Sequence, residues 1–478
     1  MASISSLRGM DRRAWNAVLA AVLGWTLDAF DFLLMVFMFS AIAKEFHADI
    51  AKVAAASVLT LAARPFGALA FGMLADRFGR RPVLVADILA YSVIEFASAF
   101  APSLGALLIL RAAFGFAMGG EWGVGASLAM ESVPPRARGF ISGLLQQGYA
   151  LGYLLAAVIY YFLFDKIGWR GMFMVGVAPA LIILLLRGGV AESPAFEKLR
   201  AARKTPQAPS RWTARSAPLA ALTLGGLLLA IAPAVIGANG AGALWWIYLI
   251  DAPVALIGLL LIFRANWRTA LWAAALMAAF NLFSHGSQDL YPTFLQRGRH
   301  LSTHVVGALA ILMNFGAIAG GLAFGAWSER AGRKVAIITA AVASLVLIPL
   351  WAFSPSLAML AAGAFFMQAM VQGAWGVVPA HLNELSPPAS RGAFPGYVYQ
   401  LGNLLASGCA VWQARLAEAR GGDWSLALAV ATGAAAIAIV LFTLLGRERR
   451  GAALGEPDRL AAADGPVGRA GLLGDHLA

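Results

Sequence analysis

The chain has 478 residues, of which 60% are hydrophobic and 13% are charged, and its mean hydropathy is +0.75. Soluble proteins average about 45–50% apolar and about 25% charged residues, so this composition excludes a soluble globular protein and predicts a polytopic membrane protein. The formal net charge of +12 could suggest a nucleic-acid partner, but the positions of the charges indicate another cause.

Apolar runs long enough to cross a bilayer, about 20 residues each, recur along the whole chain. We count fourteen, at 14–40, 52–74, 83–101, 104–130, 139–163, 170–187, 217–238, 243–263, 269–292, 303–327, 335–353, 356–381, 391–416 and 424–445. The predicted fold class is therefore all-α, with about fourteen transmembrane helices.

The basic residues between these runs are distributed by membrane side. If the N-terminus is cytoplasmic, most of the 36 Lys and Arg fall in inward loops and tails, and few, such as Lys44, Lys166 and Arg297, fall in outward loops. This asymmetry is the positive-inside rule. It predicts a multi-pass protein of the cell inner (plasma) membrane with both termini cytoplasmic, and it argues for the lipid bilayer rather than nucleic acid as the charged partner.

Chemistry of the enzymatic kind has no visible basis in the sequence. We find no nucleotide-binding loop, no metal-ligand cluster and no nucleophile with a matching base, and the single cysteine, Cys409, lies inside an apolar run. The first apolar run is too long for a cleavable signal peptide. We therefore expect a non-enzymatic protein without cofactor or metal, and a monomer.

The sequence repeats itself at an offset of 253 residues. GMLADRFGRR, beginning at Gly72, returns as GAWSERAGRK, and ESVPPRARG returns as ELSPPASRG in the same register. Internal repeats in an apolar chain are typical of secondary transporters. A carboxylate in such a turn can meet a helix N-terminus or an arginine in the other half and so latch one conformation. The predicted gating residues are Gly72, Asp76, Arg80, Glu131, Arg138, Glu329, Arg333, Glu384 and Arg391.

The repeat also divides the chain. We predict a cytoplasmic N-terminus (1–13), a six-helix half (14–187), a cytoplasmic interhalf loop (188–216), two extra transmembrane helices (217–268), a second six-helix half (269–445) and a disordered cytoplasmic tail (446–478). Two extra helices preserve orientation, so the halves are expected to be parallel repeats related by an axis along the membrane normal.

Charged residues near the bilayer midplane are functional candidates. Arg64 precedes Asp76 by twelve residues, about 18 Å of helix rise, and a charge at that depth costs about 2.5–3.5 kcal/mol or more. Its guanidinium can hold a carboxylate by two parallel hydrogen bonds, which predicts a substrate anchor. The alternative is a structural salt bridge to Asp28 or Asp31. These two and Glu121 are the candidate proton carriers, and the sequence does not single one out.

Polar residues in the run at 269–292 share a helical face. His285, Gln288 and Asp289 lie at i, i+3 and i+4, and Asn281 extends the face by another turn. A face this polar must line a cavity or a polar helix contact rather than meet lipid. His285 is a candidate proton-linked or substrate-binding group, because its reference pKa of about 6.5 lies near working pH.

Two further sets of polar residues are expected near the bilayer midplane. Asp28-Ala-Phe-Asp31 aligns with Asn281-Leu-Phe-Ser284 at the repeat offset, so one half has carboxylates where the other has neutral hydrogen-bonding groups. Glu95 and Arg111 lie at similar depth in adjacent antiparallel helices, either as a structural ion pair or as part of a proton relay.

The repeated motif and the VAESP sequence after the sixth helix resemble the signatures of the major facilitator superfamily, over nearly the whole chain. Within it, Asn281 to Thr293 matches the pattern N-x-x-[S/T]-H-x-[S/T]-Q-D-x-x-x-T of lactate and pyruvate proton symporters, and GWTLDAFDF and GGEWG are similar to the same family. These symporters belong to the wider sialate:proton symporter group, whose sialic acid members also have two extra central helices.

The resemblance implies a major facilitator fold and proton-coupled symport of a small carboxylate by alternating access, with lactate or pyruvate expected and sialic acid (N-acetylneuraminate) as the alternative. A carboxylate sensor without flux is a further alternative. The resemblance also implies substrate binding by Gln400 and Asn403, for which interhelical hydrogen bonding is the other interpretation. The candidate substrate-binding residues are Arg64, Asn281, His285, Gln288, Asp289, Thr293, Gln400 and Asn403.

Overall fold

The computed structural model describes residues 7, 10–48, 50–187, 191–201, 247–452 and 454. Within these residues every regular element is a helix, as the composition predicts. Seven helices are long and apolar enough to cross a membrane, or nine if two sharply bent helix pairs each count as one span.

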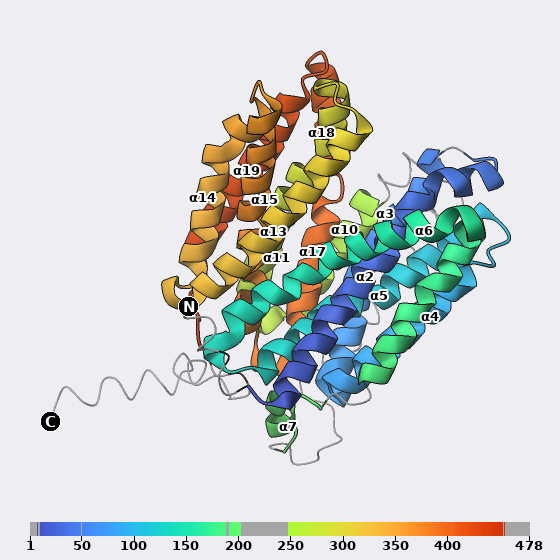
Figure 1. Ribbon diagram of the computed structural model, residues 1–478. Coiled ribbons are helices and arrows are strands. Elements are labelled where there is room, and N and C mark those ends of the chain that lie inside the picture. The colour runs from blue at the N-terminus through green and yellow to red at the C-terminus, as the bar shows by residue number, and fades with distance from the viewer. Residues whose placement is uncertain are drawn as a thin grey trace.

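The first half contains long helices joined by short turns (Figure 1): α2 (Arg12–Glu45), α3 (Ile50–Phe78), α4 (Arg80–Ser98), α5 (Leu104–Ser132) and α6 (Arg138–Arg187). Side-chain caps fix two of the starts, because Asp11 accepts a hydrogen bond from the Ala14 amide and Ser103 from that of Ala106. The α6 helix covers two of the predicted runs. They are separated at Gly168, whose φ of 62° lies in the left-handed region that favours glycine.

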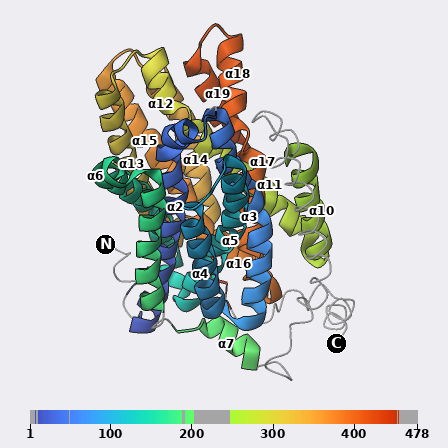
Figure 2. The same cartoon turned by 90° about the vertical axis from the view of Figure 1, so that its right-hand side faces the viewer.

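The described part of the interhalf loop contains the short helix α7 (Pro194–Ala201). The predicted extra helix at 217–238 lies outside the described residues. The second one, predicted at 243–263, is described from Ile247 as a π-helical turn (Ile247–Asp251) followed by α10 (Ala252–Ile262). In Figure 2, α10 lies beside α11 and α17 at the edge of the bundle.

The second half repeats the pattern of the first with more breaks. Its helices are α11 (Trp267–Gln288), α12 (Tyr291–Thr293), α13 (Thr303–Ala331), α14 (Arg333–Ala352), α15 (Leu357–Trp375), α16 (Val378–Leu385), α17 (Phe394–Ala406), α18 (Cys409–Ala419) and α19 (Trp424–Leu445).

Two of these breaks interrupt the apolar runs predicted at 356–381 and 391–416, although Leu357–Leu385 still counts as one membrane span. The first break follows Trp375, because Pro379 lacks the amide hydrogen that would bond to the Trp375 carbonyl. The second falls at Ser407 and Gly408, where glycine weakens the helix and the Ser407 hydroxyl bonds to the Leu404 carbonyl.

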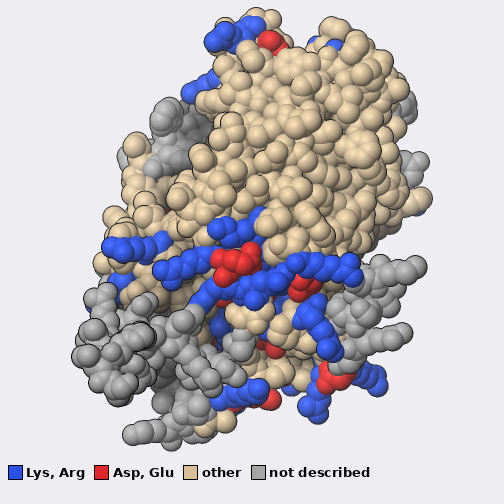
Figure 3. Space-filling view, turned by 90° about the vertical axis from the view of Figure 1, so that its left-hand side faces the viewer, with Lys and Arg blue, Asp and Glu red and all other residues tan. Residues whose placement is uncertain are grey.

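The two halves converge at one end and diverge toward the other (Figure 1). We call the convergent end the charged end, because the predicted gating residues lie there; Figure 3 shows Lys, Arg, Asp and Glu gathered in this part, below a surface almost without charge. Helices of the two halves touch here through glycine. A Cβ on Gly123 would lie 2.4 Å from the Gly396 Cα, and one on Gly143 would lie 2.4 Å from the Gly321 carbonyl oxygen. Small residues allow such close packing between membrane helices.

Candidate functional site

The repeated motifs form two matching ion clusters at the charged end. In the first half, Arg80 Nη2 lies 3.1 Å from Glu131 Oε1 and 3.3 Å from Asp76 Oδ1. In the second half, Arg333 Nη2 lies 3.0 Å from Glu384 Oε1 and 2.9 Å from Glu329 Oε1. Both arginines are fully buried. The sequence repeat is therefore also a repeat of buried contacts.

The same motifs join the two halves, again symmetrically. The Asp76 carboxylate accepts hydrogen bonds from the amides of Gly392 (2.8 Å) and Ala393 (3.3 Å) in the other half. Glu329 accepts one from the amide of Gly139, which is the repeat counterpart of Gly392. Gly72 permits the approach, because a Cβ there would lie 2.4 Å from the Ala393 Cα. The geometry is that of a latch which closes the charged end.

The remaining gating candidates lie in this latch. Arg138 Nη1 is 3.9 Å from Glu384 Oε1 across the two halves. The carbonyl of Arg391 accepts a hydrogen bond of 2.9 Å from the Ser127 hydroxyl of the first half. All nine predicted gating residues are thus brought to one end of the molecule, and their role in gating stays a prediction.

Two glutamates that the sequence analysis did not assign as site residues cap the helices that follow the motifs. Glu192 accepts hydrogen bonds from the Arg80 and Arg81 amides, and Glu448 accepts them from the Arg333 and Lys334 amides. A carboxylate at a helix N-terminus is favoured by both the free amides and the helix dipole.

The segment 447–454, which we call the tail segment, differs from the disorder predicted from Gly446 onward. Its Gly451 amide donates to Glu384 Oε1, and its Ala452 carbonyl accepts a 2.6 Å hydrogen bond from Arg138 in the other half. Leu454 packs against a buried cluster of the first half. The tail segment therefore contacts both halves at the charged end, because Glu448 bonds to the start of α14 and the tail backbone bonds to Glu384 and Arg138.

Near the middle of the helices, Arg64 and Asp28 form a buried ion pair. Arg64 Nη2 lies 3.0 Å from Asp28 Oδ1, and the two side chains are 5% and 0% exposed. Arg64 Nε and Asp28 Oδ2 have no hydrogen-bond partner in the described part of the chain. The pair is the structural salt bridge considered as the alternative, and its unused atoms leave capacity for a further ligand.

A second buried group contains Glu95, Arg111 and Asp31. Arg111 Nη1 lies 2.7 Å from Glu95 Oε2, so the ion pair expected from the sequence is present. A Cβ on Gly176 would lie 3.5 Å from oxygens of both Glu95 and Asp31, which places the two carboxyl groups close together. The Arg111 guanidinium pairs with Glu95 and lies within electrostatic range of Asp31. The third proton candidate, Glu121, is 1% exposed on α5 and lies within electrostatic range of Asp28.

The polar face of α11 divides into two sets of contacts. His285 Nδ1 lies 3.1 Å from Asp289 Oδ2, and His285 Nε2 lies 3.2 Å from Asn403 Oδ1 on α17. Gln288 instead donates to Gln368 on α15 at 2.9 Å. The predicted single strip is therefore one cluster facing α17 and another facing α15.

The other candidates on these helices differ in their partners. Asn281 is buried and donates to the Met277 carbonyl of its own helix. Gln400 is fully buried, and neither of its amide atoms has a hydrogen-bond partner within the described residues. Thr293, on α12, is half-buried. Gln400 thus has free hydrogen-bonding capacity, whereas Asn281 and Asn403 are engaged.

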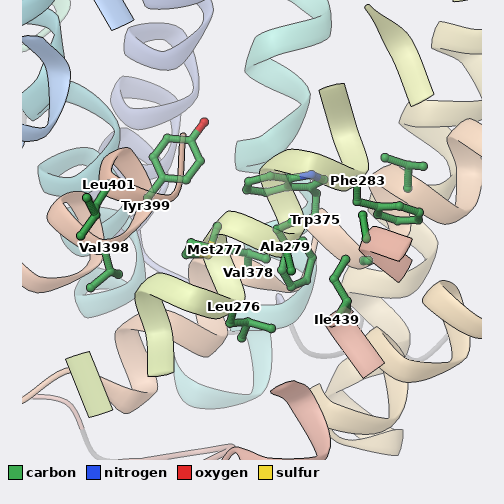
Figure 4. Packing of buried hydrophobic residues seen from close by; sticks show 14 of the residues in the cluster. Leu276, Met277, Ala279, Phe283, Trp375, Val378, Val398, Tyr399, Leu401 and Ile439 are labelled. Carbon is green, nitrogen blue, oxygen red and sulfur yellow. The ribbon is translucent and has the colours of Figure 1, made fainter. Parts of the chain in front are cut away.

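An aromatic group that the sequence analysis did not assign to the site lies between these polar groups. The Tyr399 ring stacks on Trp122 at 4.3 Å and meets Trp375 edge-on at 5.6 Å, and Trp25 approaches both Tyr399 and Tyr149. In Figure 4 the Tyr399 hydroxyl points away from its labelled hydrophobic neighbours. The sequence signal for this aromatic group is that Trp122 and Trp375 match at the repeat offset of 253 residues.

Tyr149 connects the two polar groups electrostatically. The charged side chains that act on it are Asp289 from the second half and Arg64 and Asp28 from the first. The chain thus brings a buried cation and a polar cluster from opposite halves to the same aromatic group.

Comparisons with known proteins agree with this architecture. The Sugar (and other) transporter family matches residues 17–212 and 252–447. A carboxylic acid transporter protein homolog from Saccharomyces cerevisiae is 27% identical over 467 residues, which cover 93% of this chain and 70% of that protein. The sialic acid transporter NanX from Escherichia coli is 24% identical over 389 residues, 81% of this chain and 83% of that protein.

Among solved structures, the proton:xylose symporter XylE bound to 6-bromo-6-deoxy-D-glucose superposes with a TM-score of 0.67 at 18% identity, covering 94% of this chain and 99% of that one. At this identity the likeness concerns the fold alone, which is the major facilitator fold. Because the family match covers most of the sequence, the chain belongs to the sugar (and other) transporter family of the major facilitator superfamily.

Proposed function

We propose that this transporter carries a small carboxylate, of the lactate or pyruvate type, together with a proton. The observation that supports the proposal is that Arg64 and Asp28 from one half, and Asp289 of the His285–Asp289 pair from the other, lie within electrostatic range of the same tyrosine, Tyr149. In this proposal Arg64 holds the substrate carboxylate. His285, Gln288, Asn403 and Gln400 bind its remaining polar atoms.

Charge balance supports coupling to a proton. The Arg64–Asp28 pair is neutral as it stands, so a substrate anion at Arg64 would add an uncompensated negative charge to a buried site. At about 4 Å from Asp28, the repulsion would be about 4 kcal/mol at an effective dielectric constant of 20. A proton on Asp28 removes this repulsion and frees the guanidinium for the substrate. Anion and proton therefore bind best together.

The Asp31–Glu95–Arg111 group supports the same conclusion. Two buried carboxyls beside one guanidinium avoid net charge only when one carboxyl is protonated. Asp31 and Glu95 therefore form a proton-holding pair in this proposal. Glu121, which lies within electrostatic range of Asp28, stays a candidate for passing a proton to the substrate site.

The transport cycle would alternate the open end between the two sides. The latch is closed at the charged end, and we place this end in the cytoplasm, with both termini, because Lys and Arg gather there. The protein as described then corresponds to a state closed toward the cytoplasm, in a cell inner membrane, and functional as a monomer.

Sialic acid is the second candidate substrate, because the relative NanX is similar over 81% of the chain. A carboxylate would bind Arg64 in either case, so the two substrates differ in the space they need rather than in the anchor. A carboxylate sensor without flux is a further alternative, and flux itself distinguishes it.

The test is uptake of labelled lactate and labelled sialic acid into proteoliposomes with an imposed pH gradient. We expect lactate to accumulate above equilibrium and a protonophore to abolish the accumulation. Asp28→Asn should abolish accumulation, whereas Asp423→Asn, at an exposed helix cap, should leave it unchanged. Accumulation that persists in protonophore and follows sodium would refute proton coupling. Preference for sialic acid would select the second substrate, and binding without uptake would indicate a sensor.

A further inference from the structure

Asp251 is a charged residue in an otherwise apolar part of the chain. Between Arg215 and Arg264 it is the only Asp, Glu, Lys, Arg or His. Its side chain is completely buried, and neither carboxyl oxygen has a hydrogen-bond partner among the described residues. A group of this kind within a membrane span is costly and marks function by default.

Helix geometry places Asp251 well inside the bilayer. It immediately precedes α10, whose eleven residues rise about 16 Å before the chain turns at Arg264 and enters α11. A carboxylate without partners at such depth is unstable as an anion, so the side chain binds a proton instead. Among the described residues, no charged side chain acts on Asp251.

The helix packed against α10 is α17, which carries Gln400 and Asn403. The Tyr397 hydroxyl donates a 2.8 Å hydrogen bond to the Ala255 carbonyl, and Phe263 packs on Phe394. Tyr397 is the titratable group that faces Asp251 from α17. The charged or titratable groups of α11 are Arg268 and His285, which do not act on Asp251, and Arg264 lies in the turn between the helices.

The start of α17 is also held by the latch. The amides of Gly392 and Ala393, which directly precede Phe394, donate to Asp76 of the other half. Opening the charged end breaks these bonds and releases the segment that packs on α10. Movement of α17 therefore changes the surroundings of Asp251.

We propose that Asp251 is a further membrane-buried proton-binding site, which holds its proton while the charged end is closed and releases it to water when that end opens. The site gives the extra helices a role that differs from that of the Asp31 and Glu95 pair, because it lies outside the first half and responds to α17. It rests on the transport cycle of the proposed function but not on the identity of the substrate.

The test is infrared difference spectroscopy of the full chain without substrate. Wild type minus Asp251→Asn at pH 7 should show the C=O stretching band of a protonated carboxylic acid. Wild type minus Asp423→Asn should show none, because that side chain is exposed to water at a helix cap. Asp251→Glu should restore a band, which guards against misfolding of the Asn variant. Absence of the band with correctly folded Asn and Glu variants would overturn the site.

Coupling to the latch is tested by locking the charged end. The Ala380 amide lies 3.1 Å from the Ser142 hydroxyl of the other half, so Ser142→Cys with Ala380→Cys, in a Cys409→Ser background, can be joined by oxidation. The Asp251 band should be full in the oxidised double-cysteine protein. It should be smaller in the reduced double-cysteine protein to which Asp76→Asn has been added. Equal bands in both states would refute release on opening. Neither measurement requires transport of lactate, so this result is independent of the substrate proposed.

Discussion

The latch gives the sharpest prediction, through Asp76→Asn. The substitution keeps the size of the side chain but removes its charge and turns one acceptor oxygen into an NH2 group. Asp76 now accepts two interhalf hydrogen bonds, of 2.8 and 3.3 Å. Hydrogen bonds to charged groups contribute about 1.5–3 kcal/mol and neutral ones about 0.5–1.5 kcal/mol. Asp76→Asn also removes the ion pair with Arg80 at 3.3 Å, but that pair lies within one half and Arg80 keeps Glu131, so only the two backbone bonds change the contact between the halves.

The expected loss is about 2 kcal/mol of closed-state stability, which corresponds to a factor of about 30 in the open-to-closed ratio. The assay is the labelling rate of Ser127→Cys, at a buried position in the interhalf contact, by a membrane-impermeant maleimide in a Cys409→Ser background. The rate measures how often the charged end opens. We expect a rise of about 30-fold, slower net transport and nearly unchanged equilibrium binding of substrate.

Asp423→Asn is the matched control, because Asp423 also accepts a backbone hydrogen bond, at 2.9 Å, but does not join the halves. The labelling rate should not change in this variant. If Asp76→Asn leaves the rate unchanged, or weakens substrate binding as much as transport, the latch assignment is wrong.

Three further outcomes are expected. Arg64→Lys should weaken carboxylate binding by about 1–3 kcal/mol, and lactamide should not compete with the substrate in wild type. Arg170→Lys, in an exposed ion pair, should leave carboxylate binding unchanged. Equal inhibition by lactamide would contradict the anchor. Glu45 lies beyond the membrane-spanning part of α2, where burial opposes its ionisation but hydrogen bonds from Arg170 and Trp169 outweigh burial and lower its pKa below 4.5. The difference in thermal stability between wild type and Glu45→Gln should therefore be constant above pH 4.5. It should vanish as the pH falls through the folded-state pKa of Glu45. Truncation after Gly446 should raise opening of the charged end in the Ser127→Cys assay, whereas truncation after Leu454 should not, and equal rates would exclude the tail segment from the latch.

The sequence could predict the latch because its information is local. A repeated motif with a fixed spacing of charges needs only helix geometry to bring Arg80 to Glu131 and Arg333 to Glu384. The break after Trp375 was also readable, since Pro379 marks it, but the prediction followed hydropathy alone.

Other contacts could not be predicted, because they depend on packing between distant segments. Glu448 occupies the place that Glu192 has in the first half, but it lies three residues out of the repeat register and in a segment with the composition of a disordered tail. The aromatic group around Tyr399 joins five helices, and no periodicity within one helix reveals such a group.

The two halves are alike at the charged end and different at the midplane, and this contrast follows from energetics. Asp76 with Gly392 and Glu329 with Gly139 are the same contact made twice, as rocking about an axis between two repeats requires. At the midplane, the positions 253 residues after four buried charged residues of the first half hold apolar side chains, and those after Asp28 and Asp31 hold the neutral Asn281 and Ser284. Arg64, Glu95, Arg111 and Glu121 thus correspond to Ala317, Ile348, Ala364 and Ala374.

A buried charge is costly wherever it lies, so a second copy of a proton site would add this cost without adding a substrate site. The latch lies near the boundary with water, where a second set of charged residues costs less free energy than at the midplane. The second set also strengthens closure of the charged end. In the proposed function, the second half therefore contributes the polar face of α11, with His285 and Asp289, whereas Arg64 and the candidate proton-binding carboxyls lie in the first half. This arrangement limits the number of buried charges that the duplicated fold must stabilise.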